Sequence, residues 1–145
     1  MIDAFESLSA EEQKQLLKAP ALVSVLAASY DYEITKAEKA EAFRFTHLKS
    51  YQAHPTHLFY FLKVEDSFEK NFRETVEKYA PFDDDKRHAL KAELNLTNSI
   101  IEKLEDSLAK AIHKSLLEYT DHIRKADRSF LEYFVFPLPI PGLTD

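Results

Sequence analysis

At residues 20–29 the chain reads PALVSVLAAS, and every residue except the two serines is apolar. A helix that is apolar on all its faces is enclosed on all sides, so this stretch predicts a central helix. Its alanines would allow neighbouring helices to approach closely. We expect this stretch to be the most buried element of the protein.

The residues before this stretch contain a helix start. Residues 9–12, Ser-Ala-Glu-Glu, have the pattern of a capping box, in which the Ser9 side chain accepts from the Glu12 amide and Glu12 bonds back to Ser9. The helix that begins here is expected to reach about Lys18. Pro20 would then end it, or begin a new helix as a first-turn residue.

After the apolar stretch, a second capping box at residues 35–38 predicts a helix that runs to about Lys49. Its apolar face includes Ala40 and Phe43, and His47 is a further candidate for this face.

A third helical stretch is predicted over residues 55–79, and Pro81 ends it. Its apolar residues recur at helical spacing, and they are Leu58, Phe61, Leu62, Phe68, Phe72, Val76 and Tyr79.

The C-terminal third predicts a long helix over residues 84–136, opened by the acidic residues 83–85. Neither Gly nor Pro interrupts its apolar series before Pro137. The stretch is either one continuous helix or two helices. Because Asn, Thr and Asp favour helix caps, a bend is expected near residues 95–98 or near residues 126–127.

The chain ends in an extended segment, residues 134–145, in which prolines 137, 139 and 141 alternate with apolar residues. This pattern favours a polyproline-II-like conformation. Disordered tails are usually polar, so we expect residues 134–143 to dock on a folded surface.

Composition limits both the fold and the chemistry. The chain has 145 residues, no Cys and a single Gly, Gly142. Disulfides and thiolate metal sites are thereby excluded, and Gly-rich phosphate loops and nucleophile elbows lack the glycines they need. We therefore predict one all-α domain over residues 1–145, a small helical bundle of five or six helices.

The 25 acidic residues exceed the 19 basic ones, which argues against nucleic acid and anionic membranes as partners. The N-terminus lacks the features of a secretory signal, and no apolar run approaches the ~20 residues that span a bilayer. We expect a cytoplasmic protein.

Catalytic residues are not recognisable in the sequence. Serines and histidines occur, but no motif places them together, so no enzyme is predicted. His54 and His57 have a spacing compatible with metal binding only in a nominal sense, and surface or helix-end positions are the simpler interpretation for the histidines.

Asp31, Glu33 and Glu38 are the candidate metal ligands. Acidic residues in a turn between helices can bind a hard cation through oxygen, whereas solvated turn and cap residues are the alternative. No other cofactor is predicted.

The same region, residues 22–38, resembles the first helical hairpin of the tellurite-resistance TerB-like family. Asp31, Ile34 and Glu38 match that family's motif, whereas Tyr30 and Tyr32 replace its usual Ala and Gly. The resemblance implies an all-helical fold and a divalent cation bound by the turn acids, here Asp31 and Glu38.

The sequence favours a non-catalytic helical interaction or scaffold protein that associates with itself or with another protein. The proposed contact is a homodimer formed through exposed apolar positions of the long C-terminal helix. The alternative is a TerB-like cation-binding domain in a stress response, and an unrecognised hydrolase comes third.

Overall fold

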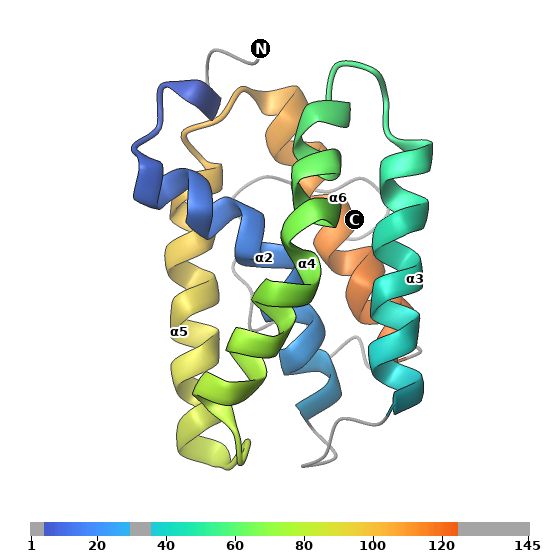
Figure 1. The fold of residues 1–145 in the computed structure, drawn as a ribbon. Coiled ribbons are helices and arrows are strands. Elements are labelled where there is room, and N and C mark those ends of the chain that lie inside the picture. Colours follow the sequence, from blue (N-terminus) through green and yellow to red (C-terminus); the bar gives the residue numbers. More distant parts are fainter. Residues whose placement is uncertain (1–4, 30–35, 125–145) are drawn as a thin grey trace, which may run out of the picture.

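The computed structural model of the protein describes residues 5–29 and 36–124. These residues form five α-helices and no strand (Figure 1). The helices are α2 (Ala10–Ala28), α3 (Lys36–Gln52), α4 (Leu58–Tyr79), α5 (Asp84–Ile101) and α6 (Asp106–Arg124). The all-α prediction is confirmed. A sixth helix is not among the described elements, and the predicted extended segment at residues 134–145 lies outside them.

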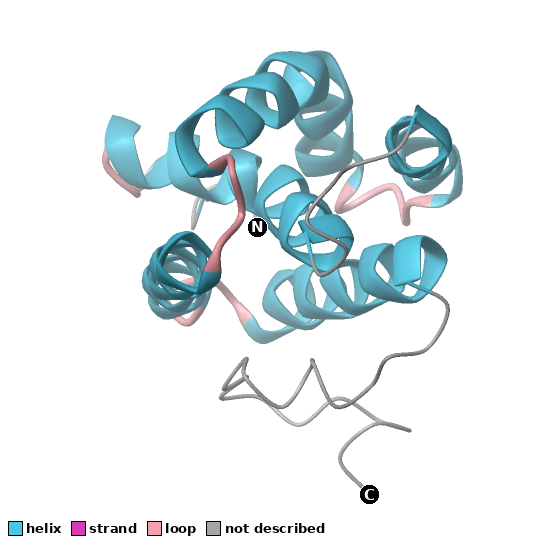
Figure 2. Ribbon diagram, turned by 90° about the horizontal axis from the view of Figure 1, so that it is seen from below, coloured by secondary structure: helices cyan, strands magenta, loops and turns pink. Residues whose placement is uncertain are grey.

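Helix α2 is the centre of the bundle. It packs against α4, α5 and α6, and the view from below shows it enclosed by the other helices (Figure 2). Every residue from Ala19 to Ser29 is buried, as the apolar sequence of this stretch predicts. Side chains from the other four helices join those of α2 in one hydrophobic core.

The predicted capping box at the start of α2 is confirmed. The Glu12 amide donates to the Ser9 hydroxyl at 3.1 Å, and the Ser9 amide donates to the Glu12 carboxylate at 3.0 Å. The prediction that Pro20 interrupts the helix is wrong, because α2 continues through Pro20.

Partners on α4 explain how α2 accommodates this proline. Proline has no N–H to donate to the carbonyl four residues earlier, which is that of Leu16. The Tyr60 hydroxyl donates to the Leu16 carbonyl at 2.8 Å instead, and the Asn71 amide donates to the neighbouring Leu17 carbonyl at 3.4 Å. The carbonyl group that the proline leaves without its usual donor is thus satisfied by a tertiary contact.

The predicted long C-terminal stretch forms two helices, α5 and α6. The bend that we predicted near residues 95–98 is not there. The chain turns at residues 102–105, not at 95–98, and residues 126–127 lie outside the description. The turn is tight: the Lys103 and Leu104 amides donate to the Ile100 and Ile101 carbonyls, each at 3.0 Å. Folding back lets α5 cover one side of α2 while α6 covers another and reaches α3.

The predicted apolar face of α3 is largely wrong. Ala40 and His47 are exposed, and Phe43 is only partly buried. The buried positions are Ala42, Phe45, Thr46 and Ser50. The sequence of α3 has few apolar residues, so its orientation is set by its neighbours α4 and α6.

Helix α4 buries most of the face expected for it, but Leu62 is 50% exposed, and Tyr60, Val64 and Thr75 are buried in addition. Within residues 5–29 and 36–124, each helix is too short or too polar to span a lipid bilayer.

Candidate functional site

The predicted cation site falls largely outside the described residues. Asp31 and Glu33 belong to the undescribed connection between α2 and α3, whereas Glu38 is half-buried in the first turn of α3. Across residues 5–29 and 36–124, no three His, Asp or Glu side chains are grouped as metal ligands would be. A site that uses Asp31 and Glu38 remains a prediction.

The next acid on α3, Glu41, is already engaged. Its two carboxylate oxygens accept from Arg44 at 3.1 and 2.6 Å, and the ring nitrogen Nδ1 of His122 on α6 lies 2.9 Å away. The hydrogen bonds from Arg44, followed by that from His122, lower the Glu41 pKa to about 2. Both oxygens of Glu41 therefore have protein partners.

The histidines are only partly the surface residues that we expected. His113 is fully buried on α6, with its Nε2 2.8 Å from the Asn98 side-chain oxygen on α5. Burial lowers the His113 pKa to about 4, so its ring is neutral at pH 7. This histidine belongs to the contact between the two C-terminal helices.

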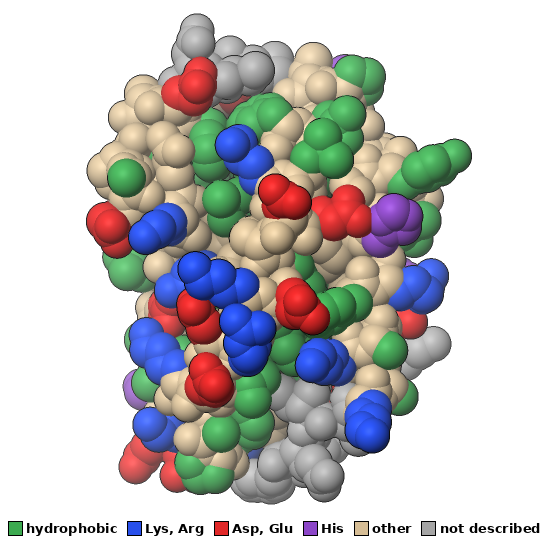
Figure 3. Space-filling model, in the orientation of Figure 1, with side chains coloured by type: hydrophobic (Ala, Val, Ile, Leu, Met, Phe, Trp, Pro, Cys, Tyr) green, Lys and Arg blue, Asp and Glu red, His purple; other side chains and the backbone are tan. Residues whose placement is uncertain are grey.

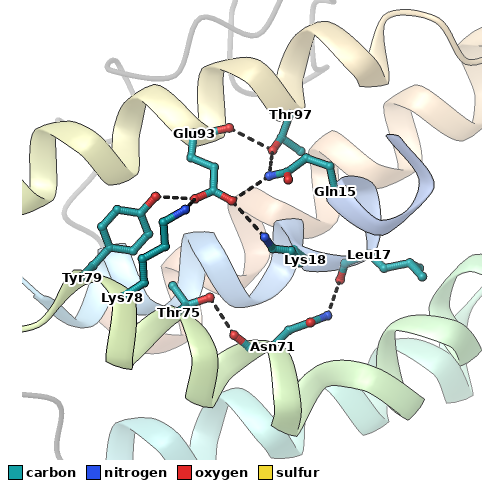
Figure 4. Close-up of polar contacts among 9 residues, drawn as sticks. All are labelled: Gln15, Leu17, Lys18, Asn71, Thr75, Lys78, Tyr79, Glu93 and Thr97. Atoms are coloured by element: carbon teal, nitrogen blue, oxygen red, sulfur yellow. Dashed lines mark hydrogen bonds and ion pairs between the residues drawn. The ribbon is translucent and has the colours of Figure 1, made fainter. Parts of the chain in front are cut away.

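A polar network centred on Glu93 links α2, α4 and α5 (Figure 4). Glu93 accepts from Gln15 at 2.9 Å, pairs with Lys18 at 3.3 Å and Lys78 at 3.2 Å, and also accepts from the Tyr79 hydroxyl. Burial acts to raise the Glu93 pKa, but these four partners outweigh it and hold the pKa at about 2. Both oxygens of the Glu93 carboxylate have partners within the protein. The network therefore acts as a clamp that holds the three helices together.

A groove of about 350 Å³ lies beside this network, between α2 and α4. Side chains of both charges line it, among them Lys14 and Lys70 together with Glu11 and Glu74. Neither sign of charge predominates strongly enough to select a ligand.

The surface carries an apolar feature at one end of the α3–α4 pair. Tyr51, near the end of α3, is 84% exposed, and Leu62, in the first half of α4, is 50% exposed. The two helices are joined at this end by Glu65, whose carboxylate lies 2.5 Å from both His47 Nδ1 and the Ser50 hydroxyl. We call Tyr51 and Leu62, with the half-buried Leu58 one turn before Leu62, the α3–α4 apolar face.

The surroundings of this face differ from those of the rest of the front surface. Figure 3 shows hydrophobic side chains gathered over the upper part of α4, with interspersed basic and acidic side chains below. A depression of about 270 Å³ next to Leu62 is lined by Lys63, Glu65 and Asp66. Leu96, 58% exposed on α5, is the remaining large apolar side chain that the described residues expose strongly.

The apolar stripe of the C-terminal region is not the surface that we expected. Leu90, Leu94 and Ile101 of α5 and Leu108, Ile112 and Leu116 of α6 are all buried in the bundle. Leu96, which does not belong to this series, is the one large apolar side chain that the described part of α5 and α6 exposes strongly.

In comparisons with known proteins, no family model, no curated protein and no solved structure matches this chain. The resemblance of residues 22–38 to the TerB-like family therefore remains a hypothesis based on a short motif.

Proposed function

We propose that the protein is a non-catalytic helical interaction domain that associates with a second copy of itself through the α3–α4 apolar face. The observation that carries the proposal is the exposure of Tyr51 and Leu62 at the same end of two adjacent helices. Isolated exposed apolar side chains are normal on protein surfaces. The proposal therefore rests on two of them at the same end of adjacent helices, with charged side chains beside Leu62.

The charges around the face favour a second copy as the partner. Lys63 and His47 lie on the same side of the pair as Glu65 and Asp66. In a two-fold symmetric contact each patch meets itself in reverse, so a patch that carries both signs of charge can be complementary to its own copy. The apolar side chains would then be covered while the charged rim pairs across the contact.

The experiment is a measurement of mass in solution across a range of protein concentrations, by light scattering or sedimentation. The wild-type protein is expected to reach twice the mass of the chain. The double variant Tyr51→Ser/Leu62→Ser is expected to remain monomeric with an unchanged helical circular dichroism spectrum, because both positions are exposed.

The matched control is Leu96→Ser, which removes a similarly exposed leucine from α5 and is expected to leave the association intact. A wild-type protein that stays monomeric at high concentration contradicts self-association. A dimer that is lost in Leu96→Ser but kept in the double variant contradicts the choice of face.

A further inference from the structure

A serine and a histidine that are distant in sequence meet where two helices begin. His57 is the residue immediately before α4, and Ser107 is the second residue of α6. The Nε2 atom of His57 lies 3.0 Å from the Ser107 hydroxyl oxygen, although the residues are 50 positions apart. His57 is buried, whereas Ser107 is exposed. A small molecule can therefore approach Ser107 from solvent while the surrounding protein fixes the His57 ring.

The environment of His57 favours its neutral form. Burial, and then the nearby His54, lower the His57 pKa below its ordinary value of 6.5, although the charge of Glu105 acts in the opposite direction. A neutral ring that carries its proton on Nδ1 has a free lone pair on Nε2, and that atom faces the serine. His57 is therefore in position to act as a base at pH 7.

Two further groups complete the arrangement. Oxygen Oε1 of Glu105 is buried without a hydrogen-bond partner in the described part of the chain, and its carboxylate would stabilise a protonated His57. The first backbone hydrogen bond of α6 runs from the Ala109 amide to the Glu105 carbonyl at 3.0 Å. The amides of Ser107 and Leu108 precede that bond and are free of intrahelical acceptors, as at any helix start, so they can donate to an oxyanion.

From the Ser107–His57 contact we infer a covalent modification site beyond the proposed interaction function: Ser107 is a histidine-activated serine that accepts acyl groups from small activated carboxylic esters. The Ser107 oxygen attacks the ester carbonyl carbon while its proton passes to His57 Nε2. The bond between that carbon and the leaving oxygen then breaks, and the departing alcohol takes the proton from His57. The products are an ester at Ser107 and the free alcohol, with His57 neutral again.

The experiment treats the full chain with p-nitrophenyl acetate at pH 7 and locates the added acetyl groups by peptide mass spectrometry. Acetylation is expected at Ser107, at a rate that His57→Gln reduces roughly 100-fold, the typical contribution of a positioned base. Ser107→Ala is expected to remove the adduct from that peptide.

The internal control is Ser99, an exposed serine on α5 whose hydroxyl donates to the Leu96 carbonyl at 2.7 Å. Because Ser99 is measured in the same sample, the ratio of the two rates does not depend on the folding of any variant. Equal acetylation of Ser107 and Ser99, no adduct at Ser107, or an unchanged rate in a folded His57→Gln variant would each overturn the inference.

Discussion

Tyr60 supplies to α2 the hydrogen bond that Pro20 removes. Its side chain is fully buried, and its hydroxyl donates to the Leu16 carbonyl at 2.8 Å. Burial also raises the Tyr60 pKa well above its usual range, so the hydroxyl keeps the proton that it donates. Pro20 is thus tolerated inside a helix because a side chain from another helix supplies the missing hydrogen-bond donor.

The variant Tyr60→Phe tests this role. It would leave the Leu16 carbonyl buried without its donor, and we expect the free energy of unfolding to fall by about 1–3 kcal/mol. Urea denaturation measures the loss. The control is Tyr51→Phe, which removes the hydroxyl of an exposed tyrosine and should change the stability by less than about 0.5 kcal/mol. Equal stability of Tyr60→Phe and the wild type would show that the carbonyl needs no donor.

Glu93 makes the stability depend on pH in a defined direction. Its folded-state pKa is about 2, below the ordinary value of 4.5, so the unfolded chain takes up this proton first as the pH falls. The stabilisation from Glu93 is complete above pH 4.5 and is lost progressively between pH 4.5 and pH 2. In Glu93→Gln this contribution is missing, so the variant should be less stable at pH 7 and should approach the wild type toward pH 2.

Denaturation at several pH values checks this difference, with the exposed Glu74→Gln on α4 as the control. If the gap between the wild type and Glu93→Gln were constant from pH 7 to pH 2, the carboxylate would not be the titrating group. Parallel loss in Glu74→Gln would indicate a general effect of charge.

At the scale of elements, connections determine what each helix can reach. The turn at residues 102–105 sends α6 back along the bundle, where His122 meets Glu41 and Lys49 pairs with Glu118 at 2.8 Å. The break also buries Ile100, Ile101 and Leu104 together at the corner. Burial of these side chains favours a turn there although the sequence has neither Gly nor Pro at this point.

The predicted cation site involves the connection between α2 and α3. If Asp31 and Glu38 bind a divalent cation, Asp31→Asn should weaken the affinity without unfolding the domain, because a carboxylate oxygen is replaced by a neutral amide. Titration calorimetry with Ca²⁺, Mg²⁺, Zn²⁺ and Mn²⁺ measures the effect, and Asp66→Asn on α4 is the control. The absence of binding heat for all four ions with the wild-type protein would contradict the site.

At the scale of the whole molecule, the bundle is organised around one helix. Contacts of α2 with α4, α5 and α6 place its apolar residues at the centre, while α3 packs on α4 and α6 at the periphery. The peripheral helix contributes Tyr51 to the α3–α4 apolar face. The arrangement thus combines an apolar centre with an outer helix that exposes Tyr51.

The apolar C-terminal sequence, residues 134–143, is expected to dock on this bundle or on a neighbouring copy. Its apolar side chains gain free energy when they leave water, and its prolines reduce the conformational entropy that docking costs. Deletion of residues 135–145 should therefore lower the melting temperature by several degrees or abolish association. Removal of residues 144–145 alone, Thr and Asp, is the control. An unchanged melting temperature and mass after the larger deletion would indicate a free segment that binds another protein.

Local sequence patterns determined the class of the fold. The capping box at residues 9–12 and the recurring apolar positions predicted helices, and the uniformly apolar residues 20–29 predicted the central one. These features depend on residues within one or two helical turns of each other, so they can be predicted without knowledge of tertiary contacts.

Tertiary structure alone decided the features that depend on partners far away in the chain. Pro20 remains inside α2 because Tyr60 is present, and the break at residues 102–105 reflects the need to cover a second side of α2. The Glu93 clamp and the Ser107–His57 contact each join residues from different helices. The spacing of residues along one helix does not predict these contacts, because their geometry depends on how the buried surfaces of several helices fit together.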